Sequence, residues 1–178
     1  TAAALIARAK PDGYTILVGG SWSCSAVWAF LPDTPYKLSD FIPIARYITL
    51  PVVIAVRSEA PWNTFKDFVE DAKSNPGKFK SGSDGGGSSL AWEAVLKTSN
   101  IQVAHVVYKG GAPNSTALLG GHVDISSVAY TPILPHIEAK KVRLLASVGH
   151  SKLKEFPNIP SFAELGHPQA SREFWHGL

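Results

Sequence analysis

Residues 51–147 alternate between short apolar runs and amphipathic stretches, and this alternation limits the possible folds more than any other feature of the sequence. The continuous apolar run Val52–Val56 is typical of a strand that is covered on both faces. Thr64–Asp67 fits a helix-capping box, and Phe65 and Phe68 begin a series of apolar residues at helical spacing. Asn75-Pro76-Gly77 is expected to end that helix.

The same pattern continues to residue 147. It predicts strands near 78–82, 103–107, 123–125 and 142–146, with helices over 88–99, 113–119 and 132–140 between them. Short strands that alternate with helices predict an α/β fold, in which helices flank a mostly parallel sheet. In such sheets, ligands bind outside the carboxyl ends of the strands.

The flanking segments do not form a complete sheet by themselves. We therefore expect residues 1–49 to be part of a first lobe, 50–148 a complete second lobe, and 149–178 a return to the first lobe. Within the flanks we expect a helix over 2–9, a strand over 14–18 and a short helix over 161–165. The sequence has no methionine, and the expectation is that it is part of a longer chain.

The segment KSGSDGGGSSLAWE (80–93) places three consecutive glycines between a predicted strand and a predicted helix. Such a run is either a slack linker or a turn built for close approach, and the uninterrupted pattern around it favours a turn. A helix that starts here offers unpaired N–H donors and a partial positive charge. The residues that we expect to contact an anion are Ser83, Gly85, Gly87 and Ser88.

Some residues of this turn allow other interpretations. Ser88 or Ser89 could be a plain helix N-cap, which does not exclude a ligand contact. Asp84 is unfavourable beside an anion, and it could cap the helix, point to solvent or meet an amine on the ligand.

Two further strand ends carry small residues. Tyr108–Pro113 repeats the arrangement of a strand end, two glycines and a helix start, and it makes Gly110 and Gly111 candidate ligand contacts. The alternative is a tight turn that binds nothing. Gly20 and Ser21 follow the predicted strand over 14–18 and form another strand end of small residues.

Other functional classes find little support in the sequence. The net charge is +3 and the basic residues are scattered, which argues against a nucleic-acid partner. Cys24 is the only cysteine and the six histidines are dispersed, so we expect no metal site. No G-x-G-x-x-G, G-K-[ST] or G-x-S-x-G motif occurs, and we expect no cofactor. No apolar run reaches the length of a transmembrane helix.

Several sequence blocks together resemble the extracytoplasmic solute-binding receptors of tripartite tricarboxylate transporters, which are often called Bug-type receptors. Their order and spacing over nearly the whole chain carry the resemblance. The blocks are AKPDGYT (9–15), FIPIA (41–45), NPGK (75–78), GSDGGGSS (82–89), VYKGGAP (107–113), LGGHVD (119–124), LPHI (134–137) and PNIPS (157–161).

The resemblance implies a two-lobed periplasmic-binding-protein fold of the second type. It also implies a carboxylate ligand, delivery to the membrane permease subunits of the transporter, and a periplasmic location with a signal peptide that is removed or outside this sequence. By position, it implies a second-lobe site at Ser83, Gly85, Gly87 and Ser88, with Gly110 and Gly111 nearby. It also implies that Gly20 and Ser21 of the first lobe contact the ligand. The family often has His at Ala91 and usually Asp at Val128, and both departures disfavour an amino-acid ligand.

The leading hypothesis is a binder of a small organic carboxylate that is not an enzyme. One alternative is an α/β hydrolase-like enzyme that uses Ser21 or Ser83 with a distant histidine. Another is a ligand-sensing receptor lobe that acts through a signalling partner.

Overall fold

The computed structural model describes residues 2–150 and 152–178. Contacts between Cα atoms divide the chain into two compact units, one of residues up to Leu50 with Phe174–Leu178, the other of Pro51–Glu173. Each unit is described by itself below.

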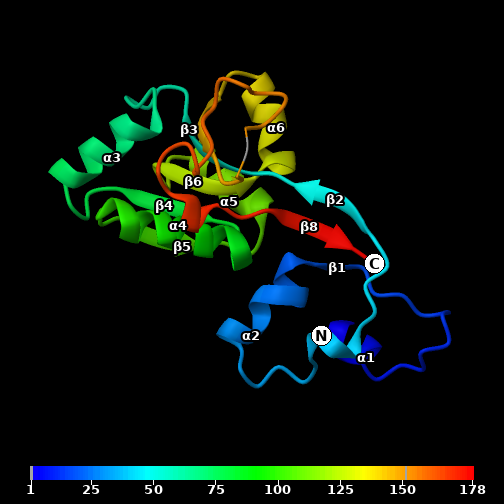
Figure 1. Ribbon diagram of the computed structural model, residues 1–178. Helices are drawn as coiled ribbons and strands as arrows, with labels where there is room; N and C mark the ends of the chain where they lie inside the picture. The colour runs from blue at the N-terminus through cyan, green and yellow to red at the C-terminus, as the bar shows by residue number, and fades with distance from the viewer. Residues whose placement is uncertain (1, 151) are drawn as a thin grey trace. The chain divides into compact units, whose positions relative to one another are not determined.

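The second unit contains the predicted alternation of strands and helices (Figure 1). The α/β fold class inferred from the sequence is therefore confirmed. Its elements are β3 (Val52–Arg57), α3 (Phe65–Ser74), β4 (Lys80–Ser83), α4 (Gly86–Ser99), β5 (Ala104–Val107), α5 (Gly111–Leu119), β6 (Ile125–Ala129), α6 (Tyr130–Glu138) and β7 (Val142–Ser147).

The five strands of this unit form one sheet in the order β5-β4-β6-β3-β7. β4 pairs in parallel with both β5 and β6, whereas β3 runs antiparallel to β6 and to β7. Four strands therefore share one direction, and their carboxyl ends meet at one edge of the sheet. The continuous apolar run of β3 predicts burial but carries no signal of strand direction.

Helices cover both faces of this sheet. α3 and α4 supply Phe65, Phe68 and Trp92 to an aromatic cluster in which neighbouring ring centroids lie 6.2–6.4 Å apart. On the other face, Leu118 of α5 and Ile133 of α6 pack with apolar residues of β3, β6 and β7. The predicted capping box starts α3, because Thr64 Oγ1 accepts the Asp67 N–H at 3.1 Å while the Asp67 carboxylate accepts the Thr64 N–H at 2.8 Å.

The segment from residue 149 to 173 groups with the second unit and not with the first. Ser161 forms a parallel bridge with Ser147, and the Phe162 N–H donates to Ser147 O at 2.9 Å. Phe162 is fully buried, with its ring centroid 5.7 Å from that of Phe65. The sequence predicted that the chain returns to the first lobe at residue 149. The contacts instead place this return at Phe174. The reason is that Phe162 completes the aromatic cluster.

The other unit contains a small antiparallel sheet in the order β1-β8-β2. The predicted helix at the start is present but shorter than expected. The elements are α1 (Ala2–Ile6), β1 (Gly19–Gly20), the π-helix η1 (Trp22–Ala26), α2 (Val27–Phe30), the 3-10 helix η2 (Leu38–Asp40), β2 (Arg46–Leu50) and β8 (Phe174–Gly177).

Two local predictions in the flanks are wrong. Residues 14–18 form no strand, because only Gly19 and Gly20 pair with β8, and Tyr14 is 93% exposed. Residues 161–165 form turns and not a helix, since Ser161 is held in its bridge to β7.

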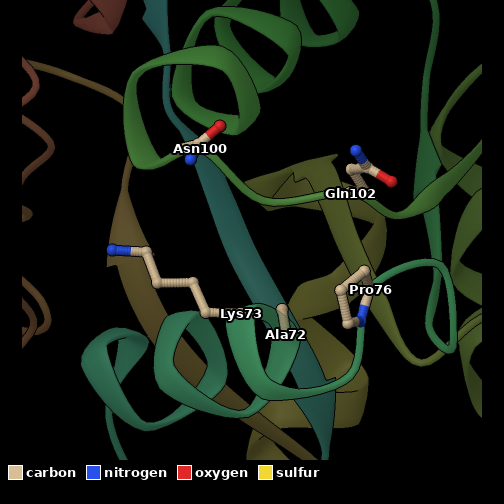
Figure 2. Close-up of a pocket in the computed structure, with 5 residues that line it drawn as sticks. All are labelled: Ala72, Lys73, Pro76, Asn100 and Gln102. Carbon is tan, nitrogen blue, oxygen red and sulfur yellow. The ribbon is translucent and has the colours of Figure 1, made fainter.

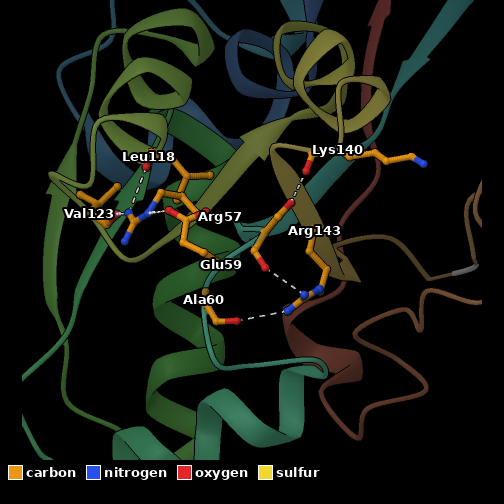
Figure 3. Close-up of polar contacts among 8 residues, drawn as sticks. Arg57, Glu59, Ala60, Leu118, Val123, Lys140 and Arg143 are labelled. Carbon is orange, nitrogen blue, oxygen red and sulfur yellow. Dashed lines mark hydrogen bonds and ion pairs between the residues drawn. The ribbon is translucent and has the colours of Figure 1, made fainter.

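Two arginines fix the loops at the edge of the sheet opposite the shared carboxyl ends (Figure 3). Arg57 Nη1 donates to Leu118 O at 3.1 Å and to Val123 O at 2.9 Å. Arg143 donates from Nη1 to Trp62 O at 2.7 Å and from Nη2 to Ser58 O at 2.9 Å. These bonds satisfy loop carbonyls far from the candidate site.

Candidate functional site

The glycine segment predicted as a turn is an ordered turn between β4 and α4. Gly85 is the N-cap of α4 with φ +84°, and Gly86 follows with φ +56°. Other residues rarely adopt such values, which explains why glycines are needed here. Ser88 is not the N-cap, because its hydroxyl donates to Gly85 O at 2.9 Å. Among the described residues no side chain caps α4, so the N–H groups of its first turn have no capping side chain.

The second predicted turn has the same construction. Gly110 is the N-cap of α5 with φ +102°, and again no side chain of the described residues caps the helix. Gly111 opens α5 in a confined space: a Cβ there would lie 2.6 Å from Pro132 Cγ and 3.2 Å from Asp84 Oδ2. Only glycine fits at this position without displacing its neighbours.

The structure brings the two turns together. β4 and β5 pair in parallel with Ser83 opposite Val107, and the Tyr108 N–H donates to Ser83 O at 2.8 Å. A Cβ on Gly85 would lie 3.5 Å from Tyr108 O. The predicted residues that gather at this edge are Ser83, Asp84, Gly85, Gly87, Ser88, Gly110 and Gly111. Lys109, in the second turn, is exposed.

A third helix, α6, starts at the same edge, but its N-terminus is already occupied. The Ala129 N–H donates to Asp84 Oδ2 at 2.6 Å, and the Tyr130 N–H donates to Pro51 O at 2.9 Å. Among the described residues, α4 and α5 are the helices of this edge whose N-termini have no side-chain cap.

Asp84 acts inside the protein in this structure. Besides the Ala129 N–H, its carboxylate accepts Asn114 Nδ2 at 2.7 Å. Burial raises the pKa of Asp84 above the usual aspartate value, while the hydrogen bonds from Ala129 and Asn114 act in the opposite direction. The carboxylate thus joins the end of β4 to α5 and to the start of α6.

Asn114 is the main polar residue of this edge that sequence reasoning missed. It is fully buried, donates also to Ser127 O at 3.0 Å, and accepts from Ser126 Oγ at 3.0 Å. Its side chain lies so close to β4 that a Cβ on Gly82 would collide with Asn114 Oδ1. The available signal was the small residue at Gly82, which leaves room for a polar side chain from the neighbouring helix.

A second polar cluster supports the turn from the α4 side of the sheet. Ser83 Oγ lies 2.5 Å from Ser89 Oγ and 2.8 Å from His105 Nε2, and His105 Nδ1 lies 3.5 Å from Glu93 Oε1. Serine, histidine and carboxylate occur in this order in hydrolases. Here Ser83 is fully buried and shared between two partners, so its hydroxyl is not positioned to attack a substrate.

Gly20 and Ser21 belong to the other unit. Gly20 ends β1, its N–H donates to Ser23 Oγ at 3.1 Å, and a Cβ would collide with the His176 ring at 2.6 Å. Ser21 precedes the π-helix η1. Their role as ligand contacts stays a prediction.

The pocket shown in Figure 2 lies elsewhere in the second unit. It has a volume of about 390 Å³ and is lined by Ala72, Lys73, Pro76, Asn100 and Gln102. Asn100 is the C-cap of α4, so this pocket is at the opposite end of that helix from the glycine turn. Helix C-termini carry partial negative charge and do not attract anions.

The fold and the site together define an α/β ligand-binding module of the periplasmic-binding-protein kind. The family model described as "Tripartite tricarboxylate transporter family receptor" matches residues 1–178. The chain belongs to this family, as its sequence blocks predicted.

Individual relatives agree with this assignment. A UPF0065 protein from Pseudomonas sp. (strain P51) is 32% identical over 98% of this chain and 53% of its own length. A TctC solute-binding protein from Polaromonas has a TM-score of 0.80 at 31% identity, covering 98% of this chain and 59% of that one. The periplasmic binding protein BugD has a TM-score of 0.83 at 28% identity, covering 98% and 59%.

The chain spans about half the length of the curated relatives it matches. Across the described residues, no helix has the combination of length and apolar character that crossing a membrane requires.

Proposed function

We propose that this protein binds a small organic carboxylate outside the cytoplasm and delivers it to the membrane permease subunits of a tripartite tricarboxylate-type transporter. The observation that carries the proposal is the side-by-side placement of two helix N-termini, α4 and α5, without capping side chains at the carboxyl edge of one sheet. Membership in the receptor family supports the same function.

The chemistry of this edge suits a carboxylate. Backbone N–H groups at a helix N-terminus donate to an anion, and the helix dipole adds a favourable interaction of about 0.3–1 kcal/mol per helix at an exposed site. Two adjacent helices can therefore share the two oxygens of one carboxylate. Binding a carboxylate at this edge needs no catalytic group, and the proposed role is binding without turnover.

Val128 bears on the chemical class of the ligand. It is fully buried among the apolar residues beneath α5 and α6, so its side chain offers no polar contact. The Asp84 carboxylate already accepts two internal hydrogen bonds. A ligand amino group would thus find no unengaged carboxylate among these residues, which supports an organic acid over an amino acid.

Calorimetry with the protein in its full natural length tests the proposal. The panel contains mono-, di- and tricarboxylates, including adipate and malate, which are present in two solved structures of this fold at 24% identity. We expect one or more acids to bind, and the uncharged amide of the same acid to fail. If no compound of the panel binds, or if any compound is turned over, the proposal is contradicted.

A further inference from the structure

His105 reaches the glycine turn from the neighbouring strand without belonging to either turn. β5 is an edge strand that pairs only with β4 in the sheet order, and the His105 ring is half-buried between β4 and α4. Its Nε2 lies 2.8 Å from Ser83 Oγ, and Ser83 is the last residue of β4 before the turn. Ser83 Oγ in turn lies 2.5 Å from Ser89 Oγ in the first turns of α4.

Three elements meet at this ring, which itself belongs to β5. β4 contributes the Ser83 hydroxyl, while α4 contributes the Ser89 hydroxyl through Ser83 and the Glu93 carboxylate, whose Oε1 lies 3.5 Å from Nδ1. Among the described residues, Glu93 is the charged group that interacts with the His105 ring.

The partners set the direction of the hydrogen bonds. A carboxylate only accepts, so we expect the neutral ring to carry its proton on Nδ1 and to leave Nε2 as an acceptor. Ser83 then donates to Nε2, and Ser89 donates to Ser83. When the ring is protonated, Nε2 becomes a donor, Ser83 must accept from it and donate to Ser89, and the Ser89 proton becomes available to another acceptor.

We propose that His105 is a positioning residue of the carboxylate site, which sets the direction of the Ser83–Ser89 hydroxyl chain beneath the first turn of α4 and reverses it on protonation. This inference rests on the proposed function for its effect on ligand binding. The chain of hydroxyls itself can be tested without a ligand.

The charge of the His105 ring determines whether carboxylate affinity should rise or fall with pH. Burial lowers the pKa of His105 below the usual histidine value, while the Glu93 carboxylate acts in the opposite direction. A cation beneath a helix N-terminus is unfavourable in the free protein, and a bound carboxylate relieves that repulsion. Carboxylate affinity should therefore rise as the ring becomes protonated, and by linkage a bound carboxylate should raise the pKa of the ring.

The first arm of the test is a ligand-free NMR titration. We expect the neutral ring to carry its proton on Nδ1, and the amide signals of Gly86 and Gly87 to follow the titration of the ring. His105→Gln, which keeps hydrogen-bonding atoms but does not titrate, should abolish this response. His167→Gln is the matched control, because the His167 ring is partly buried against Thr98 near the far end of α4, with Nδ1 2.8 Å from Thr98 Oγ1, and burial lowers its pKa too.

The second arm measures carboxylate affinity across the same pH range. For the wild type and for His167→Gln, protonation of His105 should increase carboxylate affinity by roughly fivefold or more. This increase is in addition to any effect of ligand ionisation. His105→Gln should show the effect of ligand ionisation alone.

Three results would overturn the inference: a proton on Nε2 of the neutral ring, Gly86 and Gly87 amides that ignore the ring, or the same pH dependence in His105→Gln as in the wild type. If no carboxylate binds at any pH, the proposed function fails, while the ligand-free titration still decides the role of His105.

Discussion

The Asn114 side-chain amide donates to the Asp84 carboxylate at 2.7 Å, across the gap between the first turn of α5 and the end of β4. Asn114 is fully buried, and Asp84 also holds the Ala129 N–H at the start of α6. This pair is a polar connection between the strand ends that bear the candidate site.

Replacing Asn114 with Ala should destabilise the protein and weaken carboxylate binding. The change leaves the Asp84 carboxylate and the buried Ser126 hydroxyl each short of a partner, at a cost of about 1–3 kcal/mol per group. Chemical denaturation measures the change in unfolding free energy. Asn75→Ala is the matched control, because within the described part of the chain the Asn75 side chain donates only to Asp71 at the end of α3. Equal losses in the two variants would contradict a special role for Asn114.

The charge of Asp84 should make stability depend on pH with a defined sign. Because burial raises the pKa of Asp84 in the folded state, the folded protein holds this proton more tightly than the unfolded chain does. Its contribution is therefore most favourable below the unfolded-state pKa of about 3.9, and it declines as pH rises through the folded-state pKa.

Asp84→Asn removes this titration. The stability of the wild type relative to the variant should fall as pH rises through that window, in denaturation curves collected at several pH values. A relative stability that rises over the same window would show that the hydrogen bonds outweigh burial.

The backbone of the second turn should matter for binding more than for folding. Gly110→Ala places a side chain at φ +102°, where space is open but the backbone is strained. Gly77→Ala is a matched control, since Gly77 has φ +74°, similar open space and a position after α3. Both changes should cost roughly 1 kcal/mol of stability or somewhat more. Calorimetry should show weaker carboxylate binding for Gly110→Ala only, and equal affinities would argue against the second turn as a contact.

Replacing Arg143 should lower stability without changing carboxylate affinity. Arg143→Met leaves the carbonyls of Ser58 and Trp62 without their donor at the edge opposite the site, and it should cost about 1–3 kcal/mol of stability. Lys66→Met, at an exposed pair with Glu70, should cost less than about 0.5 kcal/mol. Neither change should alter carboxylate affinity under conditions where the protein is folded. A large loss of affinity in Arg143→Met would show that the two edges are coupled.

The sequence predicted the second unit well because its signals are local. The capping box at Thr64, the glycines at 85–87 and 110–111, and the apolar run of β3 each determine their own element. These signals also placed each of the two glycine turns at the end of a strand. The resemblance to the receptor family came from blocks that are short but ordered along the chain.

What the sequence could not predict depends on contacts between distant residues. The antiparallel direction of β3 follows from its place between β6 and β7, which no local pattern encodes. Asn114 meets Asp84 across 30 positions, and His105 meets Ser83 across 22. Phe162 joins the aromatic cluster from a segment that was predicted as a short helix of the first lobe. Such partners become visible only when the strands are in register.

The most direct test of the account follows the backbone amides of Gly86, Gly87, Gly111 and Ala112 by NMR. A carboxylate that binds in calorimetry is added to the protein in its full natural length, and its uncharged amide serves as the control. If the first turns of α4 and α5 bind the carboxylate, these four amide signals shift more than those of other glycines and alanines in the second unit, and only with the carboxylate. Binding that leaves these four signals in place would contradict the account.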